Sequence, residues 1–577
     1  MDTICSKGRV DPFTATWQPS IPLFTACSAR GRPTYKYGGP VRQRHEKTRM
    51  DVNPSGQNEE RRSRRRKSHI SRSPEANDFG KMSGISDPYL GQNGKVGPAE
   101  LLEEKPVAEV PEEPLQKHEF TFRVPRDYKQ PNGDRHILHV VVIREKKAAK
   151  GSKQRLSDFQ PLPSFCYLCG GPGSPQEEDR HRVLTKHAVG NGFQMLLVDY
   201  RGTGGSEKLD LARLANGSDD EKMRAFQQAR PGNIVRDYEA VRLYLAQKAR
   251  KANVDDRLIL MGQSYGGWIA LLYAQRYPRS LRGIMLTGGM PPITASPVKV
   301  YEKLFESVAK DNETFYNDAS IRSGNKEDPR TLVLRVAKAI LARPGRNPRG
   351  NNLSLATFAS LGRRLGQPGG AAQVSGTPSA ACAVDSKNTV FDIVDTHTFN
   401  KRIIYAFEHE TQCYVSKKGD RSLWSAKQVR DRSKHYKWVS AKSAAELDEL
   451  AMEGEFFLLG ETFMPEHAED YADLRNLGGV AFAEKLAARG QTEDMWDVPL
   501  LKANLKHMDV FSVTFPTDMY VNADLAEDAT KQLGNAVKSI TLHPSVGLRH
   551  NAIRADPDKL LLIFKDLGCT YFSKTVR

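Results

Sequence analysis

Long apolar runs are missing from this sequence. Apolar residues make up 39% of its 577 residues, and no stretch approaches the about 20 consecutive apolar residues that a membrane-spanning helix needs. The first residues also lack the short apolar core that is typical of a secretory signal. We therefore expect a cytoplasmic protein that has no membrane partner.

Cysteine is scarce as well, and its odd count of seven argues against a complete disulfide framework. Cys166 and Cys169 form a C-x-x-C pair, but no second pair follows at the spacing typical of a zinc site. Both cysteines lie in an apolar stretch, which favours buried thiols. We expect no metal and no organic cofactor, and a reducing cytosolic setting.

Acidic residues are too few to balance the basic ones. Lys and Arg total 86 against 69 Asp and Glu, a formal net charge of +17, and much of the surplus lies in clusters such as residues 61–67. Residues 1–115 mix Arg, Ser, Pro and Gly without periodicity, so we expect a disordered basic N-terminal segment. The basic run could contact nucleic acid, but no aromatic residues are interleaved with it. A solvated tail is the preferred interpretation, and nucleic acid is an improbable partner.

One short stretch carries a strong chemical signal. Leu258–Met261 suits a buried strand, residues 262–266 form a G-x-S-x-G motif, and a helical pattern follows. This strand, tight turn and helix form the context that the nucleophile elbow of serine hydrolases requires. Glycines on both sides of the serine let the strand and the helix approach each other closely. The pattern predicts Ser264 as a catalytic nucleophile.

Strands and helices alternate after residue 116, which predicts a mainly parallel sheet covered on both faces. Amphipathic helices without strands then occupy residues 295–500, and the strand pattern resumes in residues 501–577. We therefore expect an α/β-hydrolase fold with core segments 116–294 and 501–577 and an inserted helical cap between them. Within the cap, the polar stretch 366–387 is predicted to be a loop.

A serine nucleophile needs a histidine and a carboxylate, which follow it in the order acid, then histidine, in α/β-hydrolases. Asp518 directly follows the strand that is predicted up to residue 515, whereas its competitors Asp524 and Asp528 lie further on, in a helical pattern. His550 lies in a loop before the closing helix and is favoured over His543, which directly follows the last strand. The predicted catalytic set is the elbow serine with Asp518 and His550.

An oxyanion hole is the second requirement of this chemistry. One donor should be the backbone N–H of Tyr265, which follows the serine. The other should come from the glycine loop at residues 170–173, with Gly171 as the candidate, because glycines let the backbone approach the substrate. This loop lacks the Lys-Ser/Thr ending of a phosphate-binding P-loop.

Several motifs together resemble one family, the proline iminopeptidases of the α/β-hydrolase superfamily, in its fungal-type branch. The matching pieces are GGPGSP at 170–175, DYRGTGGS at 199–206, GQSYGGW at 262–268, GGMPP at 288–292, HE at 409–410, GE at 460–461, DMYV at 518–521 and HNAIR at 550–554.

This resemblance implies a serine exopeptidase that removes an N-terminal residue, preferentially proline, from peptides with a free N-terminus. It also implies that carboxylates of the helical cap hold the free amino group of the substrate. Carried over by motif, Glu410 and Glu461 are the candidates, with surface or helix-capping acids as the alternative for each.

Two other functions stay open from the sequence. An esterase or amidase with a different substrate would need the same fold and nucleophile, because a fold does not fix a substrate. A non-catalytic protein that binds nucleic acid through its basic tail is more remote. An epoxide hydrolase is disfavoured, because serine and not aspartate occupies the elbow.

Overall fold

The structure is a computed structural model that describes residues 84–573, except 92–93, 147–154, 319–327, 343–345, 348, 368, 384–398, 400–401 and 455. The disorder predicted for residues 1–83 lies outside the described residues. Within the described part, no helix is long and apolar enough to cross a bilayer.

A ten-stranded sheet forms the centre of the fold, in the order β12-β11-β10-β9-β7-β8-β6-β5-β3, with β4 also paired to β5. The six strands from β12 to β8 run parallel, and β6, β5, β3 and β4 pair antiparallel. The strands are β3 (Glu100–Glu104), β4 (Ala108–Glu109), β5 (Leu115–Pro125), β6 (Arg135–Glu145), β7 (Ser164–Leu168), β8 (Gln194–Val198), β9 (Leu258–Gln263), β10 (Leu281–Thr287), β11 (Asp509–Thr514) and β12 (Lys538–Thr541). This is the mainly parallel sheet of an α/β-hydrolase, as predicted.

Ordered structure begins earlier than residue 116, so the predicted boundary is wrong. A small sheet of β1 (Ile85–Ser86) and β2 (Lys95–Val96) precedes β3. Asp87, which follows β1, is fully buried and forms an ion pair of 2.8 Å with Arg236. A buried carboxylate held by a buried guanidinium ties this segment to the core, and sequence composition does not reveal such a partner.

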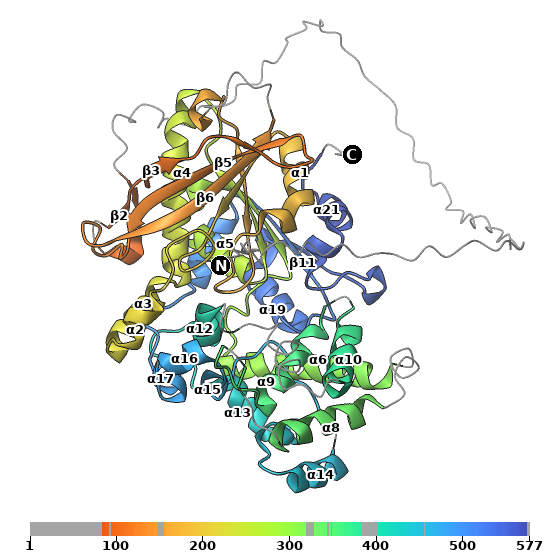
Figure 1. Cartoon of the computed structure of the whole chain (residues 1–577). Helices are drawn as coiled ribbons and strands as arrows, with labels where there is room; N and C mark the ends of the chain where they lie inside the picture. Colours follow the sequence, from red (N-terminus) through yellow and green to blue (C-terminus); the bar gives the residue numbers. More distant parts are fainter. Residues whose placement is uncertain are drawn as a thin grey trace, which may run out of the picture. The chain divides into compact units, whose positions relative to one another are not determined.

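Helices cover the sheet on both faces (Figure 1). The helix α4 (Pro231–Lys251) packs beside α5 (Tyr265–Arg276), and α1 (Arg182–Gly190) contacts α21 (Pro557–Asp566). Two shorter helices, α2 (Leu211–Ala215) and α3 (Asp219–Gln228), precede α4, and α19 (Ala523–Leu533) and α20 (Ala552–Ala555) lie after β11. Every residue of α5 is buried, so the helix behind the elbow is held on all sides.

A helical insertion separates β10 from β11. Its helices are α6 (Pro297–Asn317), α8 (Pro329–Ala342), α9 (Leu355–Ala359), α10 (Gly370–Ala383), α12 (Ile403–Tyr414), α13 (Ser425–Arg432), α14 (Ala444–Glu453), α15 (His467–Asp470), α16 (Ala472–Asn476), α17 (Gly479–Ala487) and α18 (Val498–Leu505). The loop predicted for residues 366–387 is wrong, because α10 occupies most of it. Its alanines favour a helix, and Val374 is fully buried there.

Two hydrogen bonds join the insertion to the core at α5, the helix that follows the elbow. In α5, the Tyr265 hydroxyl donates to Gln412 Oε1 at 2.7 Å, and Trp268 Nε1 donates to the Cys413 carbonyl at 2.8 Å. Both acceptors belong to α12. The insertion is therefore positioned by the same helix that carries the predicted nucleophile at its start.

Candidate active site

Ser264 stands at the turn between β9 and α5, with φ 54° and ψ −129°. Side chains with a Cβ rarely adopt this backbone conformation, so the surrounding structure must impose it. A Cβ on Gly262 would lie 2.6 Å from the Gly266 carbonyl oxygen, and one on Gly266 would lie 2.0 Å from the Leu168 carbonyl oxygen. The two glycines of the motif are therefore required by close approach of the backbone.

His550 and Asp518 meet beyond the ends of the parallel strands. His550 Nδ1 and Asp518 Oδ2 are 2.7 Å apart, and the carboxylate is only 2% exposed. The other oxygen, Asp518 Oδ1, accepts backbone N–H groups from Tyr520 at 2.8 Å and Val521 at 3.0 Å. The acid is thus fixed from one side and can hold the imidazole from the other.

The competing side chains lie elsewhere. His543 is exposed, and its Nδ1 is 2.8 Å from the Ser545 hydroxyl, in a local turn. Asp524, in α19, has a 70% exposed side chain and forms an ion pair of 3.3 Å with Lys303. Of the candidates weighed from sequence, the geometry favours His550 and Asp518.

A small cavity of about 100 Å³ brings the elbow and the histidine together. The core contributes glycines of the 170–173 loop, the elbow and the histidine loop, and the insertion contributes charged side chains. Its lining includes Gly170, Gly171, Ser264, Tyr520, His550 and Arg554 from the core, and Arg363, Arg402 and Glu461 from the insertion.

Of the predicted oxyanion donors, Gly171 lines this cavity, and Tyr265 directly follows Ser264, which also lines it. Gly170 lies so close to the serine that a Cβ on it would be 3.1 Å from Ser264 Cβ. Tyr265 is the first residue of α5, and the first N–H groups of a helix lack partners within the helix. The helix dipole also favours negative charge at this end. The arrangement can stabilise an oxyanion beside the serine.

Glu461 lies in the cavity wall with 11% of its side chain exposed, and it faces cations. Its carboxylate is 3.0 Å from Arg363 Nη2. Burial acts to raise the pKa of Glu461, but Arg363, His409 and His550 outweigh it and hold this pKa below its usual value. Glu461 therefore presents a negative charge next to the candidate histidine.

Glu410 is placed differently, and the cavity lining does not include it. Its two carboxylate oxygens accept the backbone N–H groups of Ser425 at 2.7 Å and Ala426 at 3.1 Å, at the start of α13. Burial raises the pKa of Glu410 to about 7. This geometry favours the helix-capping alternative that the sequence left open.

Three cationic side chains of the cavity were not predicted as site residues. Arg363 and Arg402 come from the insertion, where no motif drew attention to them. Arg554 ends the HNAIR motif and lies in the cavity, with its Nη2 3.5 Å from Gln263 Oε1. Its position in the HNAIR motif was the feature of the sequence from which Arg554 could have been predicted as a site residue.

The C-x-x-C cysteines are buried free thiols, as expected. Burial raises the pKa of the Cys169 thiol to about 12, so it stays protonated beside the glycine loop. Among the described residues, no group of three or more His, Cys, Asp or Glu side chains could hold a metal ion.

Comparisons with known proteins place this geometry in context. The profile of the "Serine aminopeptidase, S33" family matches residues 173–342. A proline iminopeptidase from Aeromonas sobria is 27% identical over 443 residues, covering 76% of this chain and 93% of the relative. A proline iminopeptidase from Aspergillus aculeatus is 27% identical over 401 residues, covering 67% and 83%. The crystal structure of a proline iminopeptidase from Mycobacterium smegmatis aligns with 78% of this chain and 99% of its own, at 14% identity and a TM-score of 0.33.

Proposed function

Because the chain belongs to the proline iminopeptidase family of α/β-hydrolases, we propose that it is a serine exopeptidase that releases an N-terminal residue, preferentially proline, from peptides. The observation that carries the proposal is one cavity lined by Ser264, His550 and Glu461. We assign these three side chains the roles of nucleophile, general base and anion for the free amine.

In the proposed mechanism, Ser264 Oγ attacks the first peptide carbonyl while His550 takes its proton. Asp518 faces Nδ1 of His550, which leaves Nε2 as the nitrogen for the serine proton. The same histidine then protonates the departing amine, and water hydrolyses the acyl-enzyme. Asp518 stabilises the imidazolium and keeps the ring in the productive tautomer.

Charge develops on the carbonyl oxygen during the attack, and preorganised donors stabilise it. We assign this role to the backbone N–H groups of Gly171 and Tyr265. Removing one donor of an oxyanion hole typically lowers turnover by about 10²–10³. Both candidates lie on segments packed against the core, so they need little rearrangement during the reaction.

The substrate's free amino group is proposed to bind Glu461, in a cavity that the helical insertion covers as a cap. A buried carboxylate attracts a protonated prolyl nitrogen far more strongly than an exposed one does. An acylated N-terminus carries no positive charge and would leave Glu461 without this partner. The proposal therefore requires a free N-terminus. We also propose a cytosolic setting, because the chain contains few cysteines.

The test compares arylamides of free proline, N-acetylproline and free alanine as substrates of the purified protein. We expect the free prolyl arylamide to be hydrolysed fastest and the acetylated one at least about 100-fold more slowly, because a charged hydrogen bond is lost. Ser264→Ala should remove the activity and keep the circular dichroism spectrum. Equal rates on the free and acetylated arylamides would favour the esterase or amidase alternative.

A further inference from the structure

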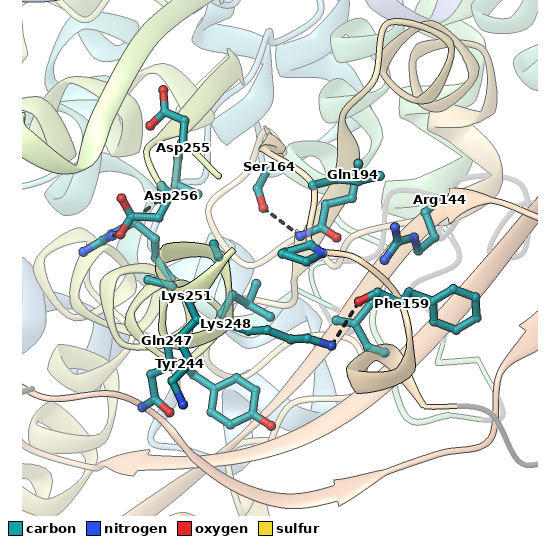
Figure 2. A pocket seen from close by; sticks show the side chains of 18 residues that line it. Arg144, Phe159, Ser164, Gln194, Tyr244, Gln247, Lys248, Lys251, Asp255 and Asp256 are labelled. Atoms are coloured by element: carbon teal, nitrogen blue, oxygen red, sulfur yellow. Dashed lines mark hydrogen bonds and ion pairs between the residues drawn. The ribbon is translucent and has the colours of Figure 1, made fainter. Parts of the chain in front are cut away.

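A second cavity of about 250 Å³ lies where three parallel strands begin (Figure 2). Ser164, Gln194 and Leu258 line it, and they are the first residues of the parallel strands β7, β8 and β9. The catalytic candidates lie at the other end of the parallel strands: Ser264 follows β9, Asp518 follows β11 and His550 comes after β12. The two cavities share no lining residue, so they are separate sites.

A row of polar side chains forms one wall of this cavity. Ser164 and Gln194 are register partners on β7 and β8, and the Gln194 amide donates to the Ser164 hydroxyl at 3.1 Å. On the other side of β8, Ile143 pairs with Met195 in an antiparallel register, which sets Arg144 opposite Gln194. Residues opposite each other in neighbouring strands present their side chains on the same face. Arg144, Gln194 and Ser164 therefore stand side by side.

Arg144 is a buried cation whose charge has no carboxylate partner among the described residues. It is 1% exposed, and its Nη2 donates to the Gln160 carbonyl at 2.8 Å. In the described part of the chain, its Nη1 has no hydrogen-bond partner, and neither does Gln194 Oε1. A buried charge without a counter-charge is costly, and such a pair of unsatisfied groups beside a cavity indicates a polar ligand.

The acidic residues of the cavity are already engaged by other cations. Asp255 pairs with Arg257 at 2.8 Å, and Asp256 pairs with Arg242 at 2.8 Å and with Arg250 at 2.7 Å. Lys248 donates to the Phe159 carbonyl at 3.0 Å, and Lys251 lines the rim and is exposed. The lining thus carries a surplus of positive charge, which favours an anion.

The remaining wall is apolar. It consists of Leu156, Phe159, Pro161, Leu162, Leu245 and Leu258. The Phe159 ring also carries the Arg144 guanidinium over its face, 5.2 Å from the ring centroid, which holds this cation in one orientation. A bare inorganic anion would leave this wall without contacts, whereas an anion with a hydrocarbon body would bury it.

We propose that this cavity binds a small monocarboxylate with an apolar body. The carboxylate would accept hydrogen bonds from Arg144 Nη1 and from the Gln194 amide, which can turn over so that its oxygen accepts from the Ser164 hydroxyl. The hydrocarbon would lie against the leucines and Pro161. The site is independent of the proposed peptidase chemistry.

The test is isothermal calorimetry of the full chain with hexanoate, hexanol and hexylamine. We expect hexanoate to bind with one site and the other two ligands to bind at least 10-fold more weakly, because neither brings a negative charge to Arg144. Equal binding of hexanoate and hexanol would overturn the proposal, and so would the absence of hexanoate binding.

Three variants locate the ligand. Arg144→Met should weaken hexanoate binding at least 10-fold and leave prolyl arylamide turnover unchanged. Gln194→Glu places a carboxylate opposite Arg144, and the resulting internal ion pair should abolish hexanoate binding. This variant tests the site even if Arg144→Met folds poorly. Arg554→Met, in the catalytic cavity, is the matched control and should bind hexanoate as the unaltered protein does. Loss of binding in Arg554→Met alone, or its retention in both other variants, would overturn the proposal.

Discussion

The α/β core and the helical insertion contribute different kinds of side chain to the candidate catalytic cavity. The core supplies the proposed reacting groups, Ser264 and His550, from segments that follow the ends of strands. The insertion supplies Arg363 and Glu461, whose charges can select a substrate. In the proposed mechanism, the groups that need one fixed geometry thus follow strands of the rigid sheet, and the groups that bind the substrate belong to the insertion.

The largest expected effect tests the core. Asp518→Asn should lower kcat for a prolyl arylamide by about 10⁴, because the amide holds the imidazole in the wrong tautomer. Asp524→Asn is the matched control, an exposed acid six residues further along that pairs with Lys303, and it should keep full activity. Equal losses in both variants would remove Asp518 from the mechanism. Steady-state kinetics with circular dichroism as the folding control measure this.

The second effect tests how the insertion is held together. The folded-state pKa of Glu410 is raised by burial to about 7 from an ordinary value of 4.5, so between these pH values the folded protein keeps a proton that the unfolded chain releases. The free energy of unfolding should therefore fall as the pH rises through this window, by up to about 3 kcal/mol from this residue. Glu410→Gln should make this slope shallower by the share of Glu410 in urea titrations at pH 4.5–7, while Asp470 and Asp311, whose pKa values burial raises to about 7 and about 6, keep their shares. An unchanged slope would contradict the buried placement.

The smallest effect tests substrate selection by the insertion. Glu461→Gln should raise KM for a free prolyl arylamide by about 10-fold, because one charge-assisted hydrogen bond to the amine is lost. Glu410→Gln, a buried acid that caps α13 outside the cavity, should leave KM unchanged at pH 8. If Glu410→Gln raises KM and Glu461→Gln does not, the amine site was assigned to the wrong carboxylate.

The core could be predicted from the sequence because its signals are local. Buried parallel strands are short apolar runs: the strand predicted at 258–261 lies within β9, and the strand predicted up to residue 515 ends within one residue of the end of β11. The elbow is visible because two backbone contacts exclude any side chain at Gly262 and Gly266. A backbone contact that leaves no room for a Cβ requires glycine, and a required glycine can be recognised in the sequence.

The insertion and the N-terminal border were predicted less well because their signals are not local. The α10 segment contains many small residues without a clear apolar face, and it packs against α8, which is distant in sequence. The ion pair between Asp87 and Arg236 joins residues that are distant in sequence. In the cavity, Arg363 and Arg402 lie in no motif that the sequence analysis singled out. Their role depends on the fold that brings them together.

Every step of the proposed mechanism depends on Ser264 as the nucleophile. A fluorophosphonate, which reacts covalently with activated serines, followed by proteolysis and mass spectrometry, tests it most directly. We expect one adduct per chain on Ser264, formed in parallel with the loss of prolyl arylamide hydrolysis, and no adduct in Ser264→Ala. An adduct on another residue, or hydrolysis that persists in Ser264→Ala, would contradict it.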